Sequence, residues 1–232
     1  MKVGIIGPSD EEISVLIGRS RTLVVTERAS LKFYSGLLEN TEVVLVICGV
    51  GKVNACIATQ VLIDQFAVTH IILTGAAGGL DERLNCGDII VSAQVGHHDL
   101  PAEILTEYHP WMNSIYMEAD KAMVNACIRV ADSAEFAGKV YKGIIVSGET
   151  FISCADKYKE LAALGAMCVD MESASVAQTC YVNRIPFVVI RSISDHADED
   201  SVEAFESNVE AVSLNSLALV EGLLVGLQSS LH

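Results

Sequence analysis

Two carboxylates and an arginine lie close together in residues 167–198 and could perform acid–base chemistry. An apolar run leads to Glu172, a run of small residues follows, and a second apolar run continues into Arg191 and Asp195. This pattern predicts two strands joined by a helix. Ligands of open α/β sheets bind outside the carboxyl ends of the strands, so we expect Glu172 and Asp195 at neighbouring strand ends that face one crevice. Placing charged groups in such a crevice costs desolvation free energy. Their presence there therefore indicates a role in binding or catalysis.

A third carboxylate of interest, Glu12, lies far upstream. It follows a short apolar strand and the Gly7-Pro8 turn, in the first turn of an expected helix. Ser9 and Glu12 have the spacing of a capping box, in which the hydroxyl and the carboxylate each accept a backbone N–H. Spacing alone therefore favours a structural role for Glu12.

Two other motifs carry weaker signals. The turn at 49–52, Gly-Val-Gly-Lys, joins a strand to a helix and could present backbone N–H groups to an anion or a ribose. It lacks the spacing of a P-loop or a dinucleotide fingerprint, so taken alone it indicates a tight turn. His97, His98 and Asp99 could suggest a metal, but adjacent strand residues point to opposite faces. We therefore expect no metal site there.

Composition and charge restrict the class of protein. The chain has 232 residues, of which 51% are hydrophobic and 19% charged, so it can bury a sizeable core. It contains no linker-like stretch, and we expect a single domain over residues 1–232. The formal net charge of −15 argues against nucleic acid and against an anionic membrane surface as partners.

The cysteines and the apolar runs indicate the compartment. None of the seven cysteines forms a C-x-x-C pair, and most stand in apolar runs, which is typical of a reducing cytosol rather than of disulfides or zinc. The N-terminal apolar run is too short for a signal peptide. No run approaches the roughly 20 apolar residues that a membrane span needs. We expect a cytoplasmic protein.

The remaining pattern predicts an α/β fold. Apolar runs predict buried strands at 3–7, 43–48, 70–73, 88–95 and 140–147, and alternating runs predict a hairpin of 23–27 with 31–38. Residues 119–134, 156–164 and 202–227 have helical patterns. We expect about seven buried strands and four to five helices. Residues 100–117 lack a steady period, and a loop of this length is usually a lid, a binding loop or an interface.

The order of these motifs resembles one family over essentially the whole chain. The chain is similar to the 5′-methylthioadenosine/S-adenosylhomocysteine nucleosidases, which belong to the nucleoside phosphorylase and hydrolase superfamily. The Met-Glu and Ser-Asp elements are specific in combination, although each is weak alone. The resemblance rests on these segments: Gly4-Ile-Ile-Gly7 with Glu11-Glu12, Gly49-Val-Gly51-Lys52-Val, Thr74-Gly-Ala-Ala-Gly78-Gly79, Gly87-Asp88-Ile, Val146-Ser-Gly148, Phe151-Ile152, Val169-Asp-Met-Glu172 and Arg191-Ser-Ile-Ser-Asp195.

The resemblance implies a fold and a reaction. The fold is a three-layer α/β/α arrangement around a mixed, twisted central sheet, nucleoside phosphorylase-like and usually a homodimer. The reaction is hydrolysis of the N-glycosidic bond of 5′-thioadenosines to adenine and a thioribose. Such enzymes bind a small nucleoside substrate and use neither a metal nor an organic cofactor.

The resemblance also implies four catalytic residues. Asp195 matches the general acid that protonates or hydrogen-bonds N7 of the leaving adenine. Glu12 matches the carboxylate that orients and deprotonates the attacking water, and Arg191 lies near that water. Glu172 matches the residue that binds the ribose hydroxyls. Cleavage of a glycosidic bond needs an acid on the leaving group and a held water on the other face, and this set supplies both.

Six further positions match the substrate-binding residues of the family. Phe151 matches the ring that stacks on adenine, and Ile152 supplies backbone bonds to the base edge. Met171 packs under the sugar, and Phe205 matches a wall of the 5′ pocket. The whole implied set is Val50, Ala76, Phe151, Ile152, Met171 and Phe205.

The chain departs from the family pattern at two places. Ala76 stands where many members have serine, so a hydroxyl that could hold the water or the sugar is missing. Residues 100–117 differ from the segment that closes the 5′ pocket in the family, partly across the dimer. The 5′-substituent preference is therefore open. Four side chains in this segment are candidates for a 5′ wall or a dimer contact: Ile104, Leu105, Tyr108 and Trp111.

Two alternative functions are compatible with the same resemblance. A purine nucleoside phosphorylase would use phosphate in place of water, and phosphate needs arginines and N–H donors around it. The 74–80 loop has no basic residue, and Glu12 would repel phosphate. A non-catalytic nucleoside-binding protein is the second alternative, and the joint presence of Glu12, Glu172, Arg191 and Asp195 disfavours it.

Overall fold

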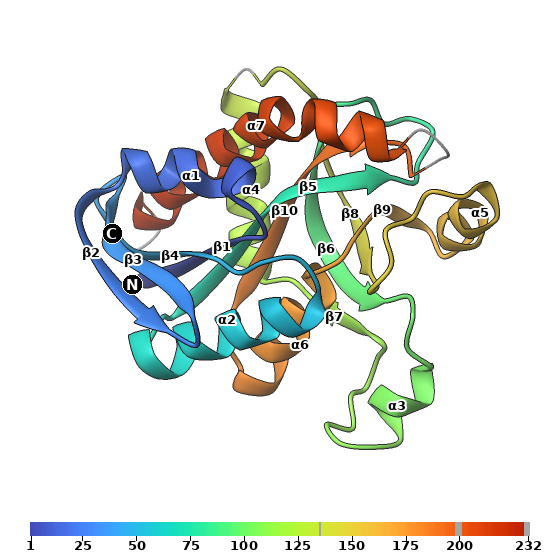
Figure 1. The fold of residues 1–232 in the computed structure, drawn as a ribbon, viewed down its shortest axis with the longest axis horizontal. Helices are drawn as coiled ribbons and strands as arrows, with labels where there is room; N and C mark the ends of the chain where they lie inside the picture. The colour runs from blue at the N-terminus through green and yellow to red at the C-terminus, as the bar shows by residue number, and fades with distance from the viewer. Residues whose placement is uncertain (135, 198–200, 230–232) are drawn as a thin grey trace.

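The computed structural model describes residues 1–134, 136–197 and 201–229. The described strands are β1 Lys2–Gly7, β2 Arg21–Arg28, β3 Leu31–Leu38, β4 Thr41–Ile47, β5 His70–Gly79, β6 Ile89–His97, β7 Tyr116–Glu118, β8 Val140–Ser147, β9 Ala166–Asp170 and β10 Phe187–Asp195. The described helices are α1 Asp10–Arg19, α2 Lys52–Phe66, α3 Ala102–Thr106, α4 Lys121–Ser133, α5 Ala155–Ala163, α6 Ser173–Asn183 and α7 Ser201–Ser229. Figure 1 shows their arrangement.

The strands form one mixed sheet that closes on itself at one end. The order is β10-β6-β8-β9-β5-β1-β4-β3-β2, with β7 on β6 and an additional pairing of β10 with β5. β5, β10, β6, β8 and β9 thus form a closed ring, while β1 to β4 extend it as a wing. Closure removes two exposed sheet edges, because every strand of the ring is paired on both sides.

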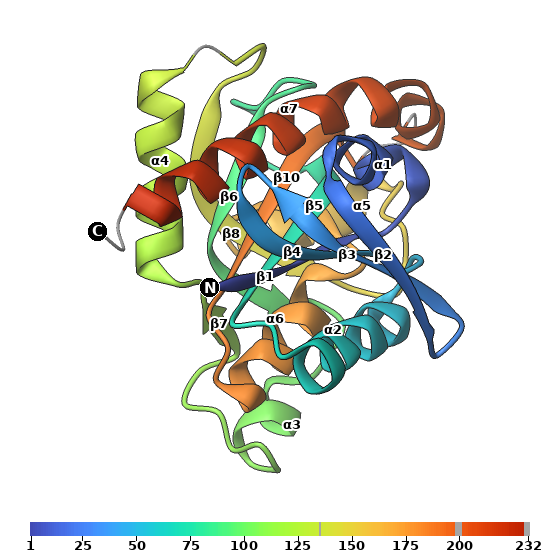
Figure 2. The same ribbon diagram turned by 90° about the vertical axis from the view of Figure 1, so that its left-hand side faces the viewer.

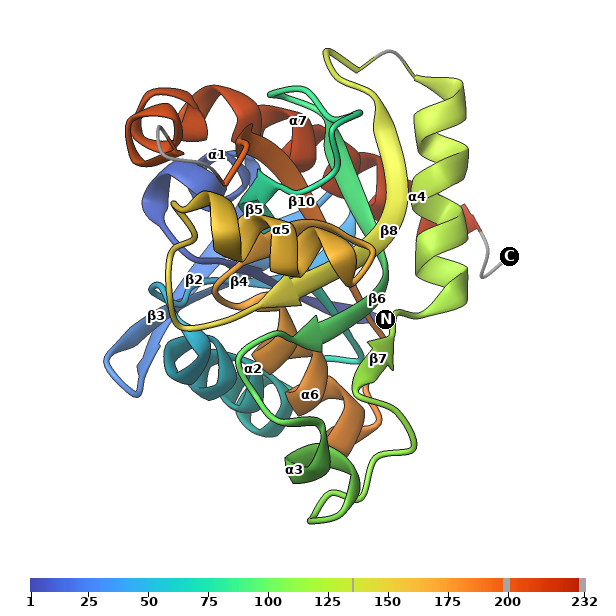
Figure 3. The same cartoon turned by 90° about the vertical axis from the view of Figure 1, so that its right-hand side faces the viewer.

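Helices cover both faces of this sheet. α1, α4 and α7 lie on one face and α2 and α6 on the opposite face, as the perpendicular views show (Figures 2 and 3). α5 packs against β9 at the side. The predicted nucleoside phosphorylase-like, three-layer fold is therefore confirmed. Burial accounts for the continuous apolar run at the start of β10: all nine residues of this strand are buried, as expected for a strand covered on both faces.

Glu172 and Asp195 do not follow directly neighbouring strands, which corrects the sequence prediction. β5 lies between β9 and β10 and pairs with both, antiparallel to β9 at Gly78 and Gly79 and parallel to β10. The prediction ended this strand at residue 73, but it continues to Gly79. The small residues 74–79 have the composition of a loop, so the sequence did not indicate a strand there. In the structure their small side chains let β9 and β10 lie close to β5 on either side.

The element count was also underestimated. The described part of the chain contains ten strands and seven helices: the hairpin strands β2 and β3 were predicted apart from the seven buried strands, whereas the short β7 and the short α3 were not predicted. The hairpin and β8 were predicted at closely matching positions. Residues 100–117 are not one long loop, since α3 and the start of β7 lie within them.

α7 is the one helix of the described residues that is long and apolar enough, by length and composition, to cross a membrane. The sequence predicted this helix at 202–227 but did not indicate a membrane span, because serines and acids interrupt its apolar residues. Half of its most apolar window is buried inside the protein. Leu217, Val220 and Leu224 are fully or almost fully buried in the main core, so here the helix serves as a core element packed on β10 and β5.

Candidate active site

A pocket of about 450 Å³ opens where β5, β9, β10 and the start of α7 meet. Five acidic side chains line it, together with apolar residues and backbone. Nine of the ten predicted site residues belong to its wall, and Arg191 lies buried behind it with no exposed surface. The lining residues that were predicted are Glu12, Val50, Ala76, Phe151, Ile152, Met171, Glu172, Asp195 and Phe205.

Glu12 is buried against the backbone of β5. Its Oε1 accepts the backbone N–H of Ala76 at 2.7 Å, and the carboxylate is buried. Ser9 occupies the N-cap, but its side chain makes no capping hydrogen bond, so the predicted hydroxyl half of the capping box is wrong. Burial raises the pKa of Glu12, and Arg191 and the Ala76 N–H oppose that rise. A carboxylate with a raised pKa is better suited to accept a proton.

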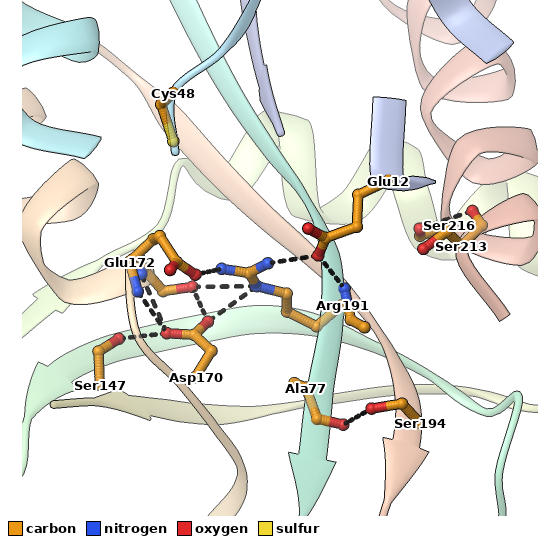
Figure 4. A network of polar contacts seen from close by, with 12 residues as sticks. Glu12, Cys48, Ala77, Ser147, Asp170, Glu172, Arg191, Ser194, Ser213 and Ser216 are labelled. Carbon is orange, nitrogen blue, oxygen red and sulfur yellow. Dashed lines mark hydrogen bonds and ion pairs between the residues drawn. The ribbon is translucent and has the colours of Figure 1, made fainter. Parts of the chain in front are cut away.

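Arg191 lies at the centre of the charged groups (Figure 4). Its Nε donates to Asp170 Oδ2 at 2.8 Å and its Nη2 donates to Glu172 Oε2 at 2.9 Å. Its Nη1 lies 3.7 Å from Glu12 Oε1 and makes no hydrogen bond to the described protein atoms. A buried guanidinium needs such partners, because desolvating an unpaired charge is costly.

Glu172 joins the arginine to the glycine-rich turn. Its Oε1 accepts the N–H of Gly51 at 2.9 Å while Oε2 accepts from Arg191. Burial raises its pKa to about 7, against the opposing effect of Arg191. The turn therefore presents a backbone N–H to a side chain of the pocket rather than directly to a ligand anion. This contact links residues 121 positions apart, so the local sequence could not reveal it.

Asp170 is a functional candidate that the sequence analysis missed. It is buried, lines the pocket and accepts hydrogen bonds from Arg191, from Ser147 and Ser173, and from backbone N–H groups. The available signal was its position two residues before Glu172, at the end of an apolar strand. A single carboxylate at a strand end is common, and only the tertiary contact with Arg191 distinguishes it.

Asp195 closes the opposite side of the pocket, at the end of β10. Its Oδ2 accepts from the Ser194 hydroxyl at 2.7 Å and its Oδ1 accepts the Ala197 N–H at 2.8 Å. The side chain is buried and lines the cavity. Asn208 of α7 donates to the Ser194 carbonyl at 3.0 Å, which ties this strand end to the helix that covers it. The structure thus brings Asp195 and Glu172 to one cavity, as predicted.

Two aromatic rings form an apolar part of the wall. The rings of Phe151 and Phe205 lie 5.9 Å apart, edge to face at 74°. Ala76 packs with Val209 and Val212 of α7, and Phe205 lies against this group, so the helix start is held over the pocket. Such a wall suits a flat ring and an apolar substituent.

The histidines predicted not to form a metal site are engaged differently. His97 Nε2 lies 2.9 Å from Gln178 Oε1, whereas the Asp99 carboxylate accepts from Lys52 Nζ at 2.7 Å. Burial lowers the pKa of both His97 and His98. Among the described residues, no group of three or more His, Cys, Asp or Glu side chains is placed to hold a metal ion.

Residues 100–117 do not contribute to the pocket of their own chain. None of them is among its described lining residues. Leu105 is buried in the main core, while Tyr108 and Trp111 are 66% and 64% exposed. The alternative of a 5′ wall within the same chain is therefore wrong for Ile104, Leu105, Tyr108 and Trp111.

Gly75 allows Glu12 and Arg191 to approach over the β5 backbone. A Cβ at this position would overlap Glu12 Oε1 and lie 2.5 Å from Arg191 Nη1, and φ is +151°. We expect Gly75→Ala to lower kcat/KM by roughly 10- to 100-fold, because displacing reacting groups by about 1 Å is costly. Steady-state kinetics measure this. Gly18→Ala, where an added Cβ meets nothing within 4 Å, is the control and retains activity.

Comparison with known proteins identifies the family. The Phosphorylase superfamily matches residues 2–225. A 5′-methylthioadenosine/S-adenosylhomocysteine nucleosidase of an Exiguobacterium species is 41% identical over 225 residues, covering 95% of this chain and 96% of that protein. The crystal structure of such a nucleosidase from Colwellia psychrerythraea, in complex with adenine, superposes with a TM-score of 0.90 at 36% identity, covering 97% of this chain and 95% of that one.

A third similar structure has a different name. The futalosine hydrolase of Helicobacter pylori has a TM-score of 0.89 and 27% identity, and covers 97% of both chains. The fold is thus shared by enzymes named for different nucleosides, and the two thioadenosine nucleosidases named above are more similar in sequence to this chain, at 41% and 36% identity. The chain belongs to the 5′-methylthioadenosine/S-adenosylhomocysteine nucleosidase family of the phosphorylase superfamily.

Proposed function

We propose that this pocket hydrolyses the N-glycosidic bond of 5′-thioadenosines with Asp195 as the general acid and a water activated by Glu12 as the nucleophile. As a member of its family the chain is an N-ribosyl hydrolase that acts on methylthioadenosine and adenosylhomocysteine. The observation that carries the assignment is that carboxylates for both ends of the bond line one cavity. Asp195 serves the leaving base, and Glu12 with Arg191 serves the water.

The charge development of the reaction fits this arrangement. As the bond to the base lengthens, the sugar gains positive charge and the purine gains negative charge. The Glu172 carboxylate accepts hydrogen bonds from the ribose hydroxyls and stabilises the positive charge that develops on the sugar. Asp195 gives its proton to N7, so adenine leaves as a neutral base. Glu12 takes a proton from the water that attacks the anomeric carbon, and the product is a free thioribose.

The apolar wall positions the two ends of the nucleoside. Phe151 stacks on adenine, the Ile152 backbone bonds its edge, and Met171 packs under the sugar. Val50 and Phe205 receive the 5′ substituent, whose thioether is apolar and needs no polar partner. Ala76 offers the backbone N–H that fixes Glu12. No hydroxyl at position 76 is then needed to hold the carboxylate in place.

Phosphate is disfavoured as the nucleophile. Five acidic residues line the described pocket, and no lysine or arginine is among its lining residues. Arg191 is already paired with Asp170 and Glu172, so its charge is offset. A phosphate dianion would meet repulsion at the position where a phosphorylase needs cationic donors.

One assay separates hydrolysis from the two alternatives. The protein is incubated with methylthioadenosine, with and without phosphate, and adenine and the sugar product are identified. Free methylthioribose formed at a rate independent of phosphate is the expected result. Sugar 1-phosphate would show a phosphorylase, and binding without turnover would show a non-catalytic protein. Parallel reactions with adenosylhomocysteine and 6-amino-6-deoxyfutalosine rank the 5′ substituents.

We further propose that the chain acts as a cytoplasmic homodimer with one nucleosidase domain, 1–232, in each subunit. Exposed apolar side chains lie on the adjacent helices α2 and α6 and on the segment around α3, which project from the same end of the molecule (Figures 1 and 3). Large exposed apolar patches mark interaction sites, and these side chains are the candidates for one. The residues concerned are Val53, Ile57, Ile104, Tyr108, Trp111, Tyr181 and Val182.

Sedimentation equilibrium tests the dimer. The wild type is expected at twice the chain mass, and Val53→Glu on α2 is expected to shift the distribution to monomer. Val25→Glu on the exposed hairpin is the matched control, because Val25 is also exposed but lies on β2, away from the proposed contact. A monomeric wild type, or equal dissociation of both variants, contradicts the proposal.

A further inference from the structure

Asp170 accepts an unusual number of hydrogen bonds for one buried carboxylate. Oδ1 accepts from the Ser147 hydroxyl at 2.5 Å and from the N–H groups of Glu172 at 3.1 Å and Ser173 at 3.0 Å. Oδ2 accepts from the Ser173 hydroxyl and from Arg191 Nε at 2.8 Å. Both oxygens are thus saturated, and the carboxylate has no acceptor position left for a ligand.

These contacts fix the direction of the guanidinium. Because Asp170 accepts the hydrogen bond of Nε, the orientation of the planar guanidinium is fixed, and only Nη1 and Nη2 are left to contact other groups. Nη2 then meets Glu172, and Nη1 is directed to the Glu12 side at 3.7 Å. Asp170 also accepts a hydrogen bond from the backbone N–H of Glu172. One carboxylate therefore sets the orientation of both charged neighbours (Figure 4).

The network is anchored from two further elements. The Ser147 hydroxyl at the end of β8 donates to Asp170 and accepts the Ala174 N–H at 2.8 Å. Ser173 begins α6, and both its N–H and its hydroxyl donate to Asp170. Such a network holds a single geometry only while all of its members are satisfied.

We propose that Asp170 is a positioning residue of the nucleosidase reaction: it holds Arg191 toward the Glu12 water site and Glu172 toward the ribose hydroxyls. This inference rests on the proposed function, because it assigns Asp170 a role through those two residues. Asp170 acts on the reaction without touching the reacting atoms.

The charge of Asp170 adds a second effect that kinetics can detect. The pKa of Glu172 is raised to about 7, chiefly by burial, and Asp170 and Glu12 raise it further while Arg191 lowers it. The Cys48 thiol faces the same group, and burial together with Glu172 raises its pKa, so it stays neutral. Glu172 must be ionised for both of its carboxylate oxygens to accept hydrogen bonds, including those from the ribose hydroxyls. Activity of the wild type is therefore expected to fall as the pH drops through about 7.

Removal of the Asp170 charge is expected to shift the acid limb of the pH–activity profile, which is the fall in activity below about pH 7. Without its negative neighbour, Glu172 is easier to ionise, so its pKa falls and ionisation persists to lower pH. In Asp170→Asn, kcat/KM for methylthioadenosine is expected to drop by about 10- to 100-fold at neutral pH, because Arg191 loses its anchor. The acid limb of the profile is expected to move to lower pH.

Two further variants separate positioning from general damage. Ser147→Ala weakens the anchor but keeps the charge, so it should lower kcat/KM by less than about tenfold and leave the acid limb in place. Asp88→Asn removes another buried carboxylate, one that accepts the N–H groups of Asn85 and Lys139 outside the pocket lining. It should retain activity and the wild-type profile. Thermal unfolding of each variant shows whether it is folded.

The outcomes are distinct. Loss of activity in Asp170→Asn with a displaced acid limb supports the proposal. Activity within twofold of wild type, or a uniform loss with an unmoved limb, overturns it. If Asp170→Asn fails to fold, Asp170→Glu decides: it keeps the charge but moves it by one methylene, so an unchanged kcat/KM would overturn the positioning role. A wild type inactive on every thioadenosine would instead refute the proposed function.

Discussion

Asp195→Asn is expected to lower kcat for methylthioadenosine by at least about 100-fold, since general acid catalysis contributes roughly 10²- to 10⁴-fold. The carboxyl group lines the pocket at the end of β10, and its two oxygens accept from Ser194 and Ala197. An asparagine can keep both contacts, with its carbonyl toward the Ala197 N–H and its amide toward the Ser194 oxygen. It cannot give a proton to N7. The loss should therefore appear in kcat.

The leaving group provides the sharper readout. A 5′-methylthioriboside of p-nitrophenol releases an anion that needs no proton, so Asp195→Asn should lose much less activity on it than on methylthioadenosine. Asp88→Asn, a remote buried carboxylate, is the matched control and should be active on both substrates. A loss of less than tenfold on methylthioadenosine, or an equal loss on both substrates, would remove Asp195 from the role of acid.

Glu12→Gln is the second variant with a large expected effect. A glutamine carbonyl can still accept the Ala76 N–H, which Glu12 Oε1 receives at 2.7 Å, but the amide cannot take a proton from water. We expect kcat to fall by about 10²- to 10⁴-fold. The free energy of unfolding should fall by about 1 kcal/mol or less, because glutamine keeps the hydrogen bond with Ala76 and is as suitable as glutamate at this position of a helix.

Kinetics and urea unfolding on the same preparations separate the two effects. Glu11→Gln is the matched control: Glu11 lies in the same first turn of α1 and is exposed. It should keep full activity. Retention of more than a tenth of wild-type kcat in Glu12→Gln would mean that another group activates the water. A large loss of stability with proportionate loss of activity would mean that Glu12 is structural.

The sequence determined the parts of the protein that depend on local pattern and on motif order. β8 and the β2–β3 hairpin were predicted because the apolar and alternating runs that indicate strands are local features of the sequence. Glu172 and Asp195 were expected at one crevice, and they line one pocket. The joint order of the motifs indicated the family, which the comparisons confirm.

Only the tertiary structure decided which partners the charged groups choose. Spacing alone favoured a helix cap for Glu12, whereas the hydrogen bond that its carboxylate accepts from Ala76, 64 residues away, was not visible in the sequence. Asp170 was one acid among many until folding placed it against Arg191 and Ser147. The second half of β5, which lies between β9 and β10, was equally hidden, because its small residues carry no apolar signal. The physical reason is the same in each case: these hydrogen bonds join segments far apart in the chain, and local periodicity carries no information about them.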